Sequence, residues 1–261
     1  MRVVLTIAGS DSIAGAGIQA DLKTFAALGV YGASAITAVT SQNTTRVGEV
    51  FAMPPRIVRS QIDCVAEDTA LSAVKTGMLA NADIVTVVSA TLARLDQPNV
   101  VVDPVMAATN LCTLLTPDAV SILKVRLFPL AAVVTPNISE AGALSGTVVD
   151  SPEAAREAAR RILDLGPKAV VVKGGHLSGG RAIDVLYDGR TFTEFAAPRS
   201  PIPQIHGAGC TFASALAAGL ALGDDLPSAV DRAKRYVTGA IEHAVVIGRG
   251  AAVLDHLWQR L

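Results

Sequence analysis

Short runs of Val, Ile and Ala alternate along the chain with longer stretches in which apolar residues recur every three or four positions. The short runs are typical of buried strands, which we expect at Val3–Ala8, Ala33–Val39, Val100–Asp103, Ala131–Thr135 and Ala169–Lys173. The longer stretches predict helices at Ile18–Leu28, Pro55–Glu67, Asp83–Leu95, Pro117–Val125 and Glu153–Leu165. This alternation predicts an α/β fold with a largely parallel sheet.

The last part of the chain has a different pattern. Two helices are expected at Ala208–Leu222 and Pro227–Ile247, with no strand between them, so that a helical end closes the fold. The segment from Arg199 to Gln204 contains two prolines and is expected to be a rigid connector. Because no internal repeat or flexible linker interrupts the pattern, we interpret residues 1–261 as one domain.

Composition supports this interpretation and excludes a membrane span. Hydrophobic residues make up 51% of the chain and aromatic residues only 4%, which suits Ala-rich helices packed on Val-rich strands. The mean hydropathy is +0.45, but no apolar run reaches the roughly 18 residues of a spanning helix. The first residues resemble a strand and lack a signal-peptide cleavage site, so a cytoplasmic location is expected.

Charge and cysteine content limit the possible partners. The 22 basic residues nearly balance the 23 acidic residues, so the chain has no basic field for a nucleic acid or a membrane surface. The chain has three cysteines, which lie far apart in the sequence: Cys64, Cys112 and Cys210. An odd number of widely spaced cysteines indicates reduced thiols, and their spacing matches no metal-binding motif.

Polar residues follow the predicted strands, where open parallel sheets bind their ligands. The segments concerned are Gly9-Ser-Asp-Ser, Thr40-Ser-Gln-Asn, Asp103-Pro, Thr135-Pro-Asn and Lys173-Gly-Gly-His. His206-Gly-Ala-Gly-Cys-Thr stands before an Ala-rich helix, where small residues let backbone N–H groups approach an anion. The glycines alone could equally form a tight turn. Cys210 could be a thiol whose pKa is lowered by the helix, or a small buried residue.

Eight motifs, in order and spacing, resemble the hydroxymethylpyrimidine/phosphomethylpyrimidine kinases of the ribokinase-like superfamily. They are Ala8-Gly-Ser-Asp-Ser, Gln19-Ala-Asp-Leu-Lys-Thr, Ala38-Val-Thr-Ser-Gln-Asn-Thr, Lys75-Thr-Gly-Met-Leu, Val102-Asp-Pro-Val-Met, Thr135-Pro-Asn, Lys173-Gly-Gly-His and His206-Gly-Ala-Gly-Cys-Thr. The resemblance implies a ribokinase-like three-layer α/β/α fold with a mostly parallel central sheet, and a homodimer. It further implies two ATP-dependent phosphorylations of an aminopyrimidine in thiamine biosynthesis.

The resemblance also implies roles for residues on the ATP side. Asp103 and Glu140 would help to hold Mg²⁺, for which carboxylates are suitable hard ligands. Asn137 and Lys173 would contact ATP, and Asn137 would share a helix face with Glu140. The ammonium group of Lys173 would reach the transferred phosphate as a point charge. For each acid alone, a helix cap or a surface charge is the simpler interpretation.

The same resemblance places Gly207, Ala208 and Gly209 around the transferred phosphoryl group, with Cys210 as the base where sugar kinases use Asp. His206, beside these residues, is a candidate for orienting their loop.

On the substrate side, Gly9, Asp21, Gln42 and Met78 match family positions that contact the aminopyrimidine ring. Gln42 suits this role because its amide offers both a donor and an acceptor. A polar residue in a surface turn is the simpler interpretation of Gln42, and core filling that of Met78.

The chain departs from the family pattern at three places. Ile13 and Ala14 replace glycines of the first loop, and Ala208 replaces a Thr of the phosphate-binding motif. The segment Ala107-Ala-Thr-Asn-Leu-Cys differs from the usual lid. Two alternatives therefore stay open: a pyridoxal kinase with Cys112 as its lid cysteine, and a catalytically silent relative. The early strand, Gly-rich loop and helix leave a third, a dinucleotide-dependent oxidoreductase, although Gly9 to Gly17 lacks the Gly-x-Gly-x-x-Gly spacing of such enzymes.

Overall fold

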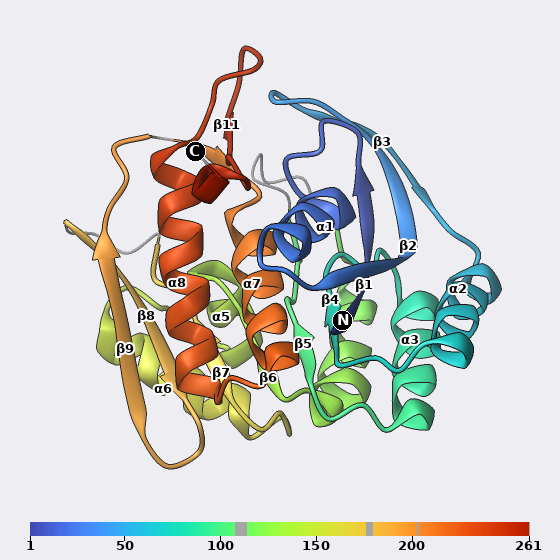
Figure 1. Cartoon of the computed structure of the whole chain (residues 1–261). Helices are drawn as coiled ribbons and strands as arrows, with labels where there is room; N and C mark the ends of the chain where they lie inside the picture. Colours follow the sequence, from blue (N-terminus) through green and yellow to red (C-terminus); the bar gives the residue numbers. More distant parts are fainter. Residues whose placement is uncertain (108–113, 176–179, 203, 261) are drawn as a thin grey trace.

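A computed structural model describes residues 1–107, 114–175, 180–202 and 204–260 of the chain. One sheet of nine strands runs through the molecule in the order β3-β2-β1-β4-β5-β6-β7-β8-β9 (Figure 1). The pairs from β2 to β7 are parallel, whereas β3 at one edge and β8 and β9 at the other are antiparallel. The strands are β1 (Val3–Asp11), β2 (Tyr31–Gln42), β3 (Val47–Ala52), β4 (Ala73–Thr76), β5 (Val100–Val102), β6 (Val133–Val134), β7 (Val170–Val172), β8 (Arg181–Tyr187) and β9 (Phe192–Pro198).

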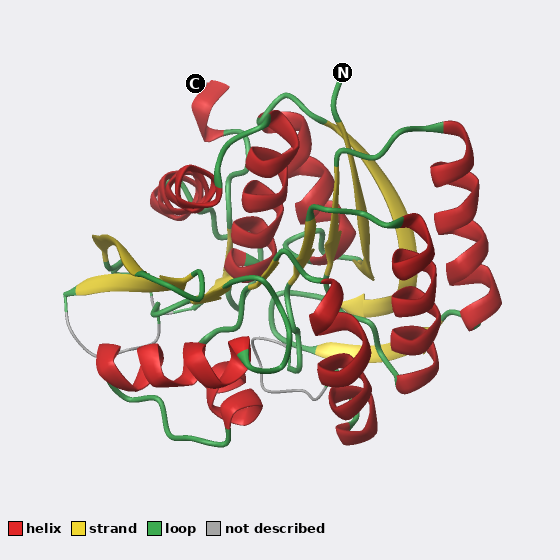
Figure 2. Cartoon of the chain, turned by 90° about the horizontal axis from the view of Figure 1, so that it is seen from below, coloured by secondary structure: helices red, strands yellow, loops and turns green. Residues whose placement is uncertain are grey.

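Helices cover both faces of this sheet (Figure 2). One layer consists of α1 (Gly17–Ala27), α7 (Ala208–Leu222) and α8 (Leu226–Glu242). The other consists of α2 (Pro55–Asp68), α3 (Ala82–Leu95), α4 (Pro117–Ile122), α5 (Ile138–Ser145) and α6 (Pro152–Leu163). The three-layer α/β/α fold expected from the resemblance is therefore confirmed.

The side-chain alternation of the strands divides the core into two. In β5, Val100 and Val102 pack with α3, and Val101 faces the opposite layer with α7. All three side chains are buried, because a parallel strand covered by helices on both faces has no side open to water. Helix α7 is rich in Ala and is buried on nearly every side. Its small side chains let its backbone lie close to the sheet.

Some elements differ from the prediction. The last predicted helix ends at Glu242, not at Ile247, because the β-branched residues that follow leave the helix and Val245 bridges Val253. Instead of a purely helical end, the chain returns through β11 (Ala252–Val253), which pairs in parallel with β10 (Ile205–His206). The helix predicted at Pro117–Val125 ends at Ile122 and continues as a wider turn to Leu127. None of the helices that the structure describes is long and apolar enough to cross a membrane.

Candidate active site

The candidate site lies where the loops after the parallel strands meet the beginning of α7. Gly207 precedes this helix with a φ of 90°, and a side chain at Gly207 would come within 1.8 Å of the carbonyl oxygen of Gly15. Only glycine fits this left-handed conformation and close approach. The first intrahelical bond runs from the N–H of Thr211 to the oxygen of Gly207 at 2.9 Å. The amides of Ala208, Gly209 and Cys210 therefore stand at the positive end of the helix.

Lys173 and Asp103 form an ion pair beside this helix end. The distance from Lys173 Nζ to Asp103 Oδ1 is 2.7 Å, and Thr135 Oγ1 donates to the same oxygen at 3.1 Å. A side chain at Gly209 would lie 3.2 Å from Lys173 Nζ, so glycine keeps the ammonium group next to the backbone. Burial alone would lower the pKa of Lys173, but the charges of Asp103 and Glu140 raise it, which keeps the group cationic.

Glu140 and Asn137 cap α5 reciprocally. Asn137 Oδ1 accepts from the N–H of Glu140 at 2.9 Å, and Glu140 Oε2 accepts from the N–H of Asn137 at 2.8 Å. Asn137 is therefore the residue before the helix, and the prediction that it shares a helix face with Glu140 is wrong. Burial raises the pKa of Glu140 to about 7; the charge of Lys173 opposes this rise and that of Asp103 adds to it.

The acidic residues suit a metal ion that keeps much of its water. Within the described ranges, no three His, Cys, Asp or Glu side chains gather closely enough to hold a metal by themselves. The raised pKa of Glu140 is caused mainly by burial, and the charge of the nearby Asp103 adds to the rise, so a cation bound between the two carboxylates would favour their ionised forms. Mg²⁺ needs only one or two protein carboxylates when phosphates and water complete its shell. The donor set therefore fits Mg²⁺.

Cys210 stands in the first turn of α7, but its thiol does not have the lowered pKa that the sequence suggested. Desolvation raises the pKa to about 11, and the charges of Asp21 and Asp103 add to the rise. The charge of Lys75 and the hydrogen bond that the N–H of Gly17 donates to the sulfur lower the pKa, but by less than burial raises it. At pH 7 only about one molecule in 10⁴ would carry a thiolate there. The predicted lowering of the pKa is wrong because burial outweighs the helix end.

Asp21 lies beneath the site. Its carboxylate accepts from Lys75 at 2.9 Å, from Ser214 at 2.6 Å and from Thr6 at 2.6 Å, and its side chain exposes no surface. The direct ring contact expected from the resemblance would require this carboxylate to leave its three donors. In the structure Asp21 instead ties α1 to β4 and α7.

Gly9 and Met78 lie together at the ends of β1 and β4. A side chain at Gly9 would come within 3.1 Å of Met78 Sδ, so the sulfur closely covers the backbone there. Met78 is 8% exposed and borders a cavity of about 190 Å³. The other residues of the cavity wall are Val50, Ala52, Ala80, Asn81, Leu114, Leu115 and Thr116.

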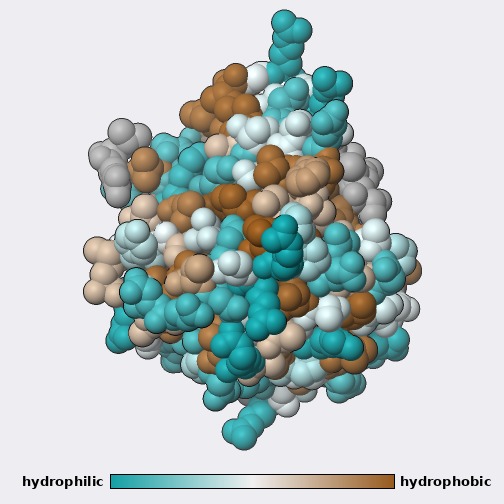
Figure 3. Space-filling model, turned by 90° about the vertical axis from the view of Figure 1, so that its right-hand side faces the viewer, coloured by the Kyte–Doolittle hydropathy of each residue, from teal (hydrophilic) through white to brown (hydrophobic). Residues whose placement is uncertain are grey.

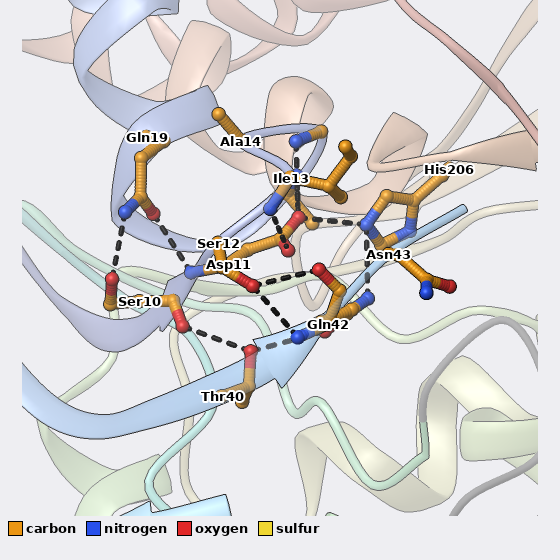
Figure 4. A network of polar contacts seen from close by, with 12 residues as sticks. Ser10, Asp11, Ser12, Ile13, Ala14, Gln19, Thr40, Gln42, Asn43 and His206 are labelled. Carbon is orange, nitrogen blue, oxygen red and sulfur yellow. Dashed lines mark hydrogen bonds and ion pairs between the residues drawn. The ribbon is translucent and has the colours of Figure 1, made fainter. Parts of the chain in front are cut away.

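A polar network joins the loop after β1 to the end of β2 and to the residue before Gly207 (Figure 4). Asp11 Oδ2 lies 2.8 Å from His206 Nε2, which in turn lies 3.1 Å from Gln42 Nε2. Sequence reasoning assigned no role to Asp11, although it stands in the quoted Gly9-Ser-Asp-Ser motif. Gln42 is half-buried in this network and is not a free surface residue.

The altered first loop has a strained position. Ala14 has a φ of 60°, a conformation that costs an ordinary residue about 1–2 kcal/mol and glycine very little. The replacement of a family glycine by Ala14 therefore makes the loop less permissive, and the carbonyl oxygen of Ala14 accepts from Lys23 at 2.8 Å. Cys112, the candidate lid cysteine, lies outside the described residues.

The family model described as phosphomethylpyrimidine kinase matches residues 11–255. The chain belongs to the phosphomethylpyrimidine kinase family. A hydroxymethylpyrimidine/phosphomethylpyrimidine kinase of Streptomyces coelicolor is 47% identical over 98% of this chain and 94% of that protein. The thiamine biosynthesis bifunctional protein ThiED of Geobacter sulfurreducens is 50% identical over 97% of this chain, which spans 52% of that longer protein.

Solved structures with this fold include enzymes for two kinds of ring. The ADP complex of Bacillus subtilis pyridoxal kinase has a TM-score of 0.92 and 38% identity, and the match covers 100% of this chain and 99% of that one. A phosphomethylpyrimidine kinase from Clostridium difficile has a TM-score of 0.83 and 42% identity, with 92% and 100% covered. The fold is thus common to both kinds of kinase, and the ring-side residues must distinguish them.

Proposed function

We propose that this chain is an ATP-dependent kinase of thiamine biosynthesis. It transfers a phosphoryl group to 4-amino-5-hydroxymethyl-2-methylpyrimidine, and then a second one to the resulting monophosphate. The observation that carries the proposal is the Lys173–Asp103 ion pair at the N-terminus of α7, with 2.7 Å between Nζ and Oδ1. The identity of 45–48% to relatives named as hydroxymethylpyrimidine/phosphomethylpyrimidine kinases supports the choice of substrate.

Electrostatic positioning explains how these residues would act. The amides of Ala208, Gly209 and Cys210 receive the oxygens of the transferring group, whose negative charge the helix end stabilises. Lys173 stays cationic in its acidic surroundings and neutralises charge on the same group. The oxygen–phosphorus bond to the substrate forms as the bond from the γ phosphorus to the bridging oxygen of ADP breaks.

The hydroxyl proton in the first transfer passes to a phosphoryl oxygen and then to water. In the second transfer the attacking phosphate oxygen has no such proton to lose. We therefore assign Cys210 as a neutral thiol that packs against the transferring group, because its pKa of about 11 makes it a poor resting base. Mg²⁺, held through Asp103 and Glu140, would supply further positive charge to the phosphates of ATP.

The ring would lie over Gly9 and Met78 and beside Gln42. Met78 offers a polarisable apolar surface, and Gln42 offers an amide. Asp21 supports this region from below by holding α1 and β4 in place, without touching the ring.

Pyridoxal kinase is the second candidate, because the pyridoxal kinase of Bacillus subtilis matches the fold with a TM-score of 0.92. The test is ADP release from Mg-ATP with hydroxymethylpyrimidine, its monophosphate and pyridoxal under identical conditions. Turnover of both pyrimidines above that of pyridoxal is expected. A preference for pyridoxal would transfer the function to vitamin B6 salvage, and lack of turnover on all three would contradict both assignments.

A further inference from the structure

Three residues that are far apart in the sequence meet at the ring side of the site. Asp11 ends β1, Gln42 ends β2, and His206 directly precedes the phosphate-binding loop (Figure 4). His206 and Asp11 are 6% and 3% exposed, so their contact is shielded from water. None of these contacts is needed to hold a phosphate, so the network has another role in the site.

Asp11 determines where His206 carries a proton. The N–H groups of Ile13, Gly15 and Ala16 donate to the carboxylate of Asp11 at 2.9–3.1 Å. Burial alone would raise the pKa of Asp11, but these donors and His206 lower it, so the group is ionised and only accepts. The ring nitrogen Nε2 of His206, 2.8 Å from Oδ2, must therefore carry a hydrogen.

This hydrogen determines which end of the Gln42 amide faces His206. The two ends of an amide have nearly the same shape and are distinguished by their hydrogen bonds. With Gln42 Nε2 placed 3.1 Å from His206 Nε2, two N–H groups would face each other. The amide oxygen in that position removes this repulsion, and it can share the single Nε2–H of His206, which points to Asp11, as a second and weaker acceptor.

The contacts of Thr40 independently indicate the same orientation of the Gln42 amide. Its hydroxyl group has a single hydrogen, which Ser10 O accepts at 3.0 Å. The second contact of Thr40 Oγ1, 3.3 Å from the other end of the Gln42 amide, therefore needs a donor on Gln42. That donor is the amide NH₂ group, which turns the oxygen of Gln42 toward His206.

We propose that His206 is a positioning residue that fixes the polarity of Gln42 and thereby makes the site select an aminopyrimidine edge. The acceptor of Gln42 faces the His206 side, and its donor faces Thr40. A ring with an amino group beside a ring nitrogen matches this polarity: its amino group donates to Oε1 and its nitrogen accepts from Nε2–H. This inference rests on the proposed function, in which Gln42 contacts the ring.

The position of His206 also links ring recognition to phosphate binding. His206 is bonded to Gly207, and Gly207 is packed so closely on Gly15 that no side chain fits between them. The N–H of Gly15 is held by Asp11 at 3.0 Å. Loss of the His206 side-chain contact would therefore loosen Gln42 and leave the backbone packing of Gly207 on Gly15 in place.

The test compares hydroxymethylpyrimidine with its analogue that lacks the 4-amino group. In His206→Phe, which keeps the ring shape but loses the N–H, we expect KM for the amino substrate to rise about tenfold, as the loss of one hydrogen bond implies. KM for the analogue and kcat for both should change less than threefold. His206→Gln, which restores an N–H donor, should recover most of the preference. Thr40→Val should reduce it in the same direction.

His243→Gln is the matched control, because His243 lies at the end of α8 and stacks on Trp258. An equal loss for both substrates with a lowered Tm would overturn the proposal in favour of a purely structural role. If His206→Phe does not fold, the preference of Thr40→Val for the amino substrate over the analogue decides the proposal. If the wild-type protein phosphorylates neither ring, the proposed function fails; calorimetric binding of the two rings to wild type and Thr40→Val then decides this inference separately.

Discussion

Lys75 Nζ lies 2.9 Å from Asp21 Oδ2, and neither side chain exposes any surface. Burial by itself would lower the pKa of Lys75, but the charge and hydrogen bond of Asp21, together with the charges of Cys210 and Asp103, raise it. The pair therefore stays ionised inside the protein, where it joins β4 to α1. Because Lys75 also lowers the pKa of the nearby Cys210, this ion pair is part of the electrostatic support of the site.

Removal of one partner of this pair should be costly. Lys75→Met leaves the Asp21 carboxylate buried without its counter-ion, and we expect a loss of about 3–5 kcal/mol in the free energy of unfolding. Urea denaturation measures this loss, with Lys168→Met at an exposed position as the control. The double variant Lys75→Met/Asp21→Leu should lose less than Lys75→Met alone. Equal stability of Lys75→Met and wild type would contradict the buried ion pair.

Lys173→Met tests the phosphoryl-transfer assignment. We expect kcat to fall by about 10²–10³-fold, which is the usual effect of removing one electrostatic stabiliser of a transition state. Steady-state ADP release measures kcat, and Lys168→Met again serves as the control. A change in KM for the pyrimidine with an unchanged kcat would show that Lys173 does not act in the phosphoryl-transfer step.

The pH dependence of kcat tests the role of Cys210. A base with a pKa of about 11 would make log kcat rise by one for each pH unit between pH 7 and pH 9, because only its deprotonated form is active. With Cys210 as a neutral thiol we expect no such slope, and Cys210→Ala should retain the wild-type profile at a reduced rate. A unit slope that disappears in Cys210→Ala would restore Cys210 as the base.

Asp11 should make stability depend on pH. Its pKa is lower in the folded protein than the ordinary 3.8, so the unfolded chain binds the proton more readily. The resulting stabilisation is present above about pH 4–5 and is lost as the pH falls through the lower folded value. Asp11→Asn should therefore lower Tm at pH 7 and approach wild type near pH 3, which calorimetry can follow. A difference in Tm that is constant with pH would contradict this linkage.

The homodimer implied by the family resemblance is a further proposal. Val39 and Phe51 are cross-strand neighbours on β2 and the edge strand β3, and they are 46% and 66% exposed. Figure 3 shows this side of the molecule, where hydrophobic side chains gather among hydrophilic ones. We expect Phe51→Glu to weaken the dimer in light-scattering measurements, whereas Val148→Glu at another exposed position should not. A wild-type monomer would contradict the proposal.

Most of the parallel core could be predicted from the sequence because its strands are uninterrupted apolar runs, such as Val100–Val102. The central strand β4 was missed, because the buried Lys75 and Thr76 interrupt its apolar run. The two-residue strands β10 and β11 could not, because so short a pairing leaves no periodic pattern. Antiparallel β8 and β9 were also missed, since their residues are only partly buried.

For the site, the position of Lys173 and Asp103 after predicted strands and the family resemblance placed them at one edge of the sheet, and the structure brings both to the start of α7. The state of Cys210 depends on desolvation and on charges from Asp21 and Asp103, which only the packed structure reveals. The contact of Asp11 with His206 spans 195 positions in the sequence and leaves no local pattern.

The pairing of β10 with β11 makes the phosphate-binding loop depend on a segment that is distant in the sequence. Ile205 and His206, which enter the phosphate-binding loop, are aligned with Ala252 and Val253. A folding intermediate that holds the large sheet but lacks this pairing would therefore contain the folded core and an unfinished phosphate-binding loop.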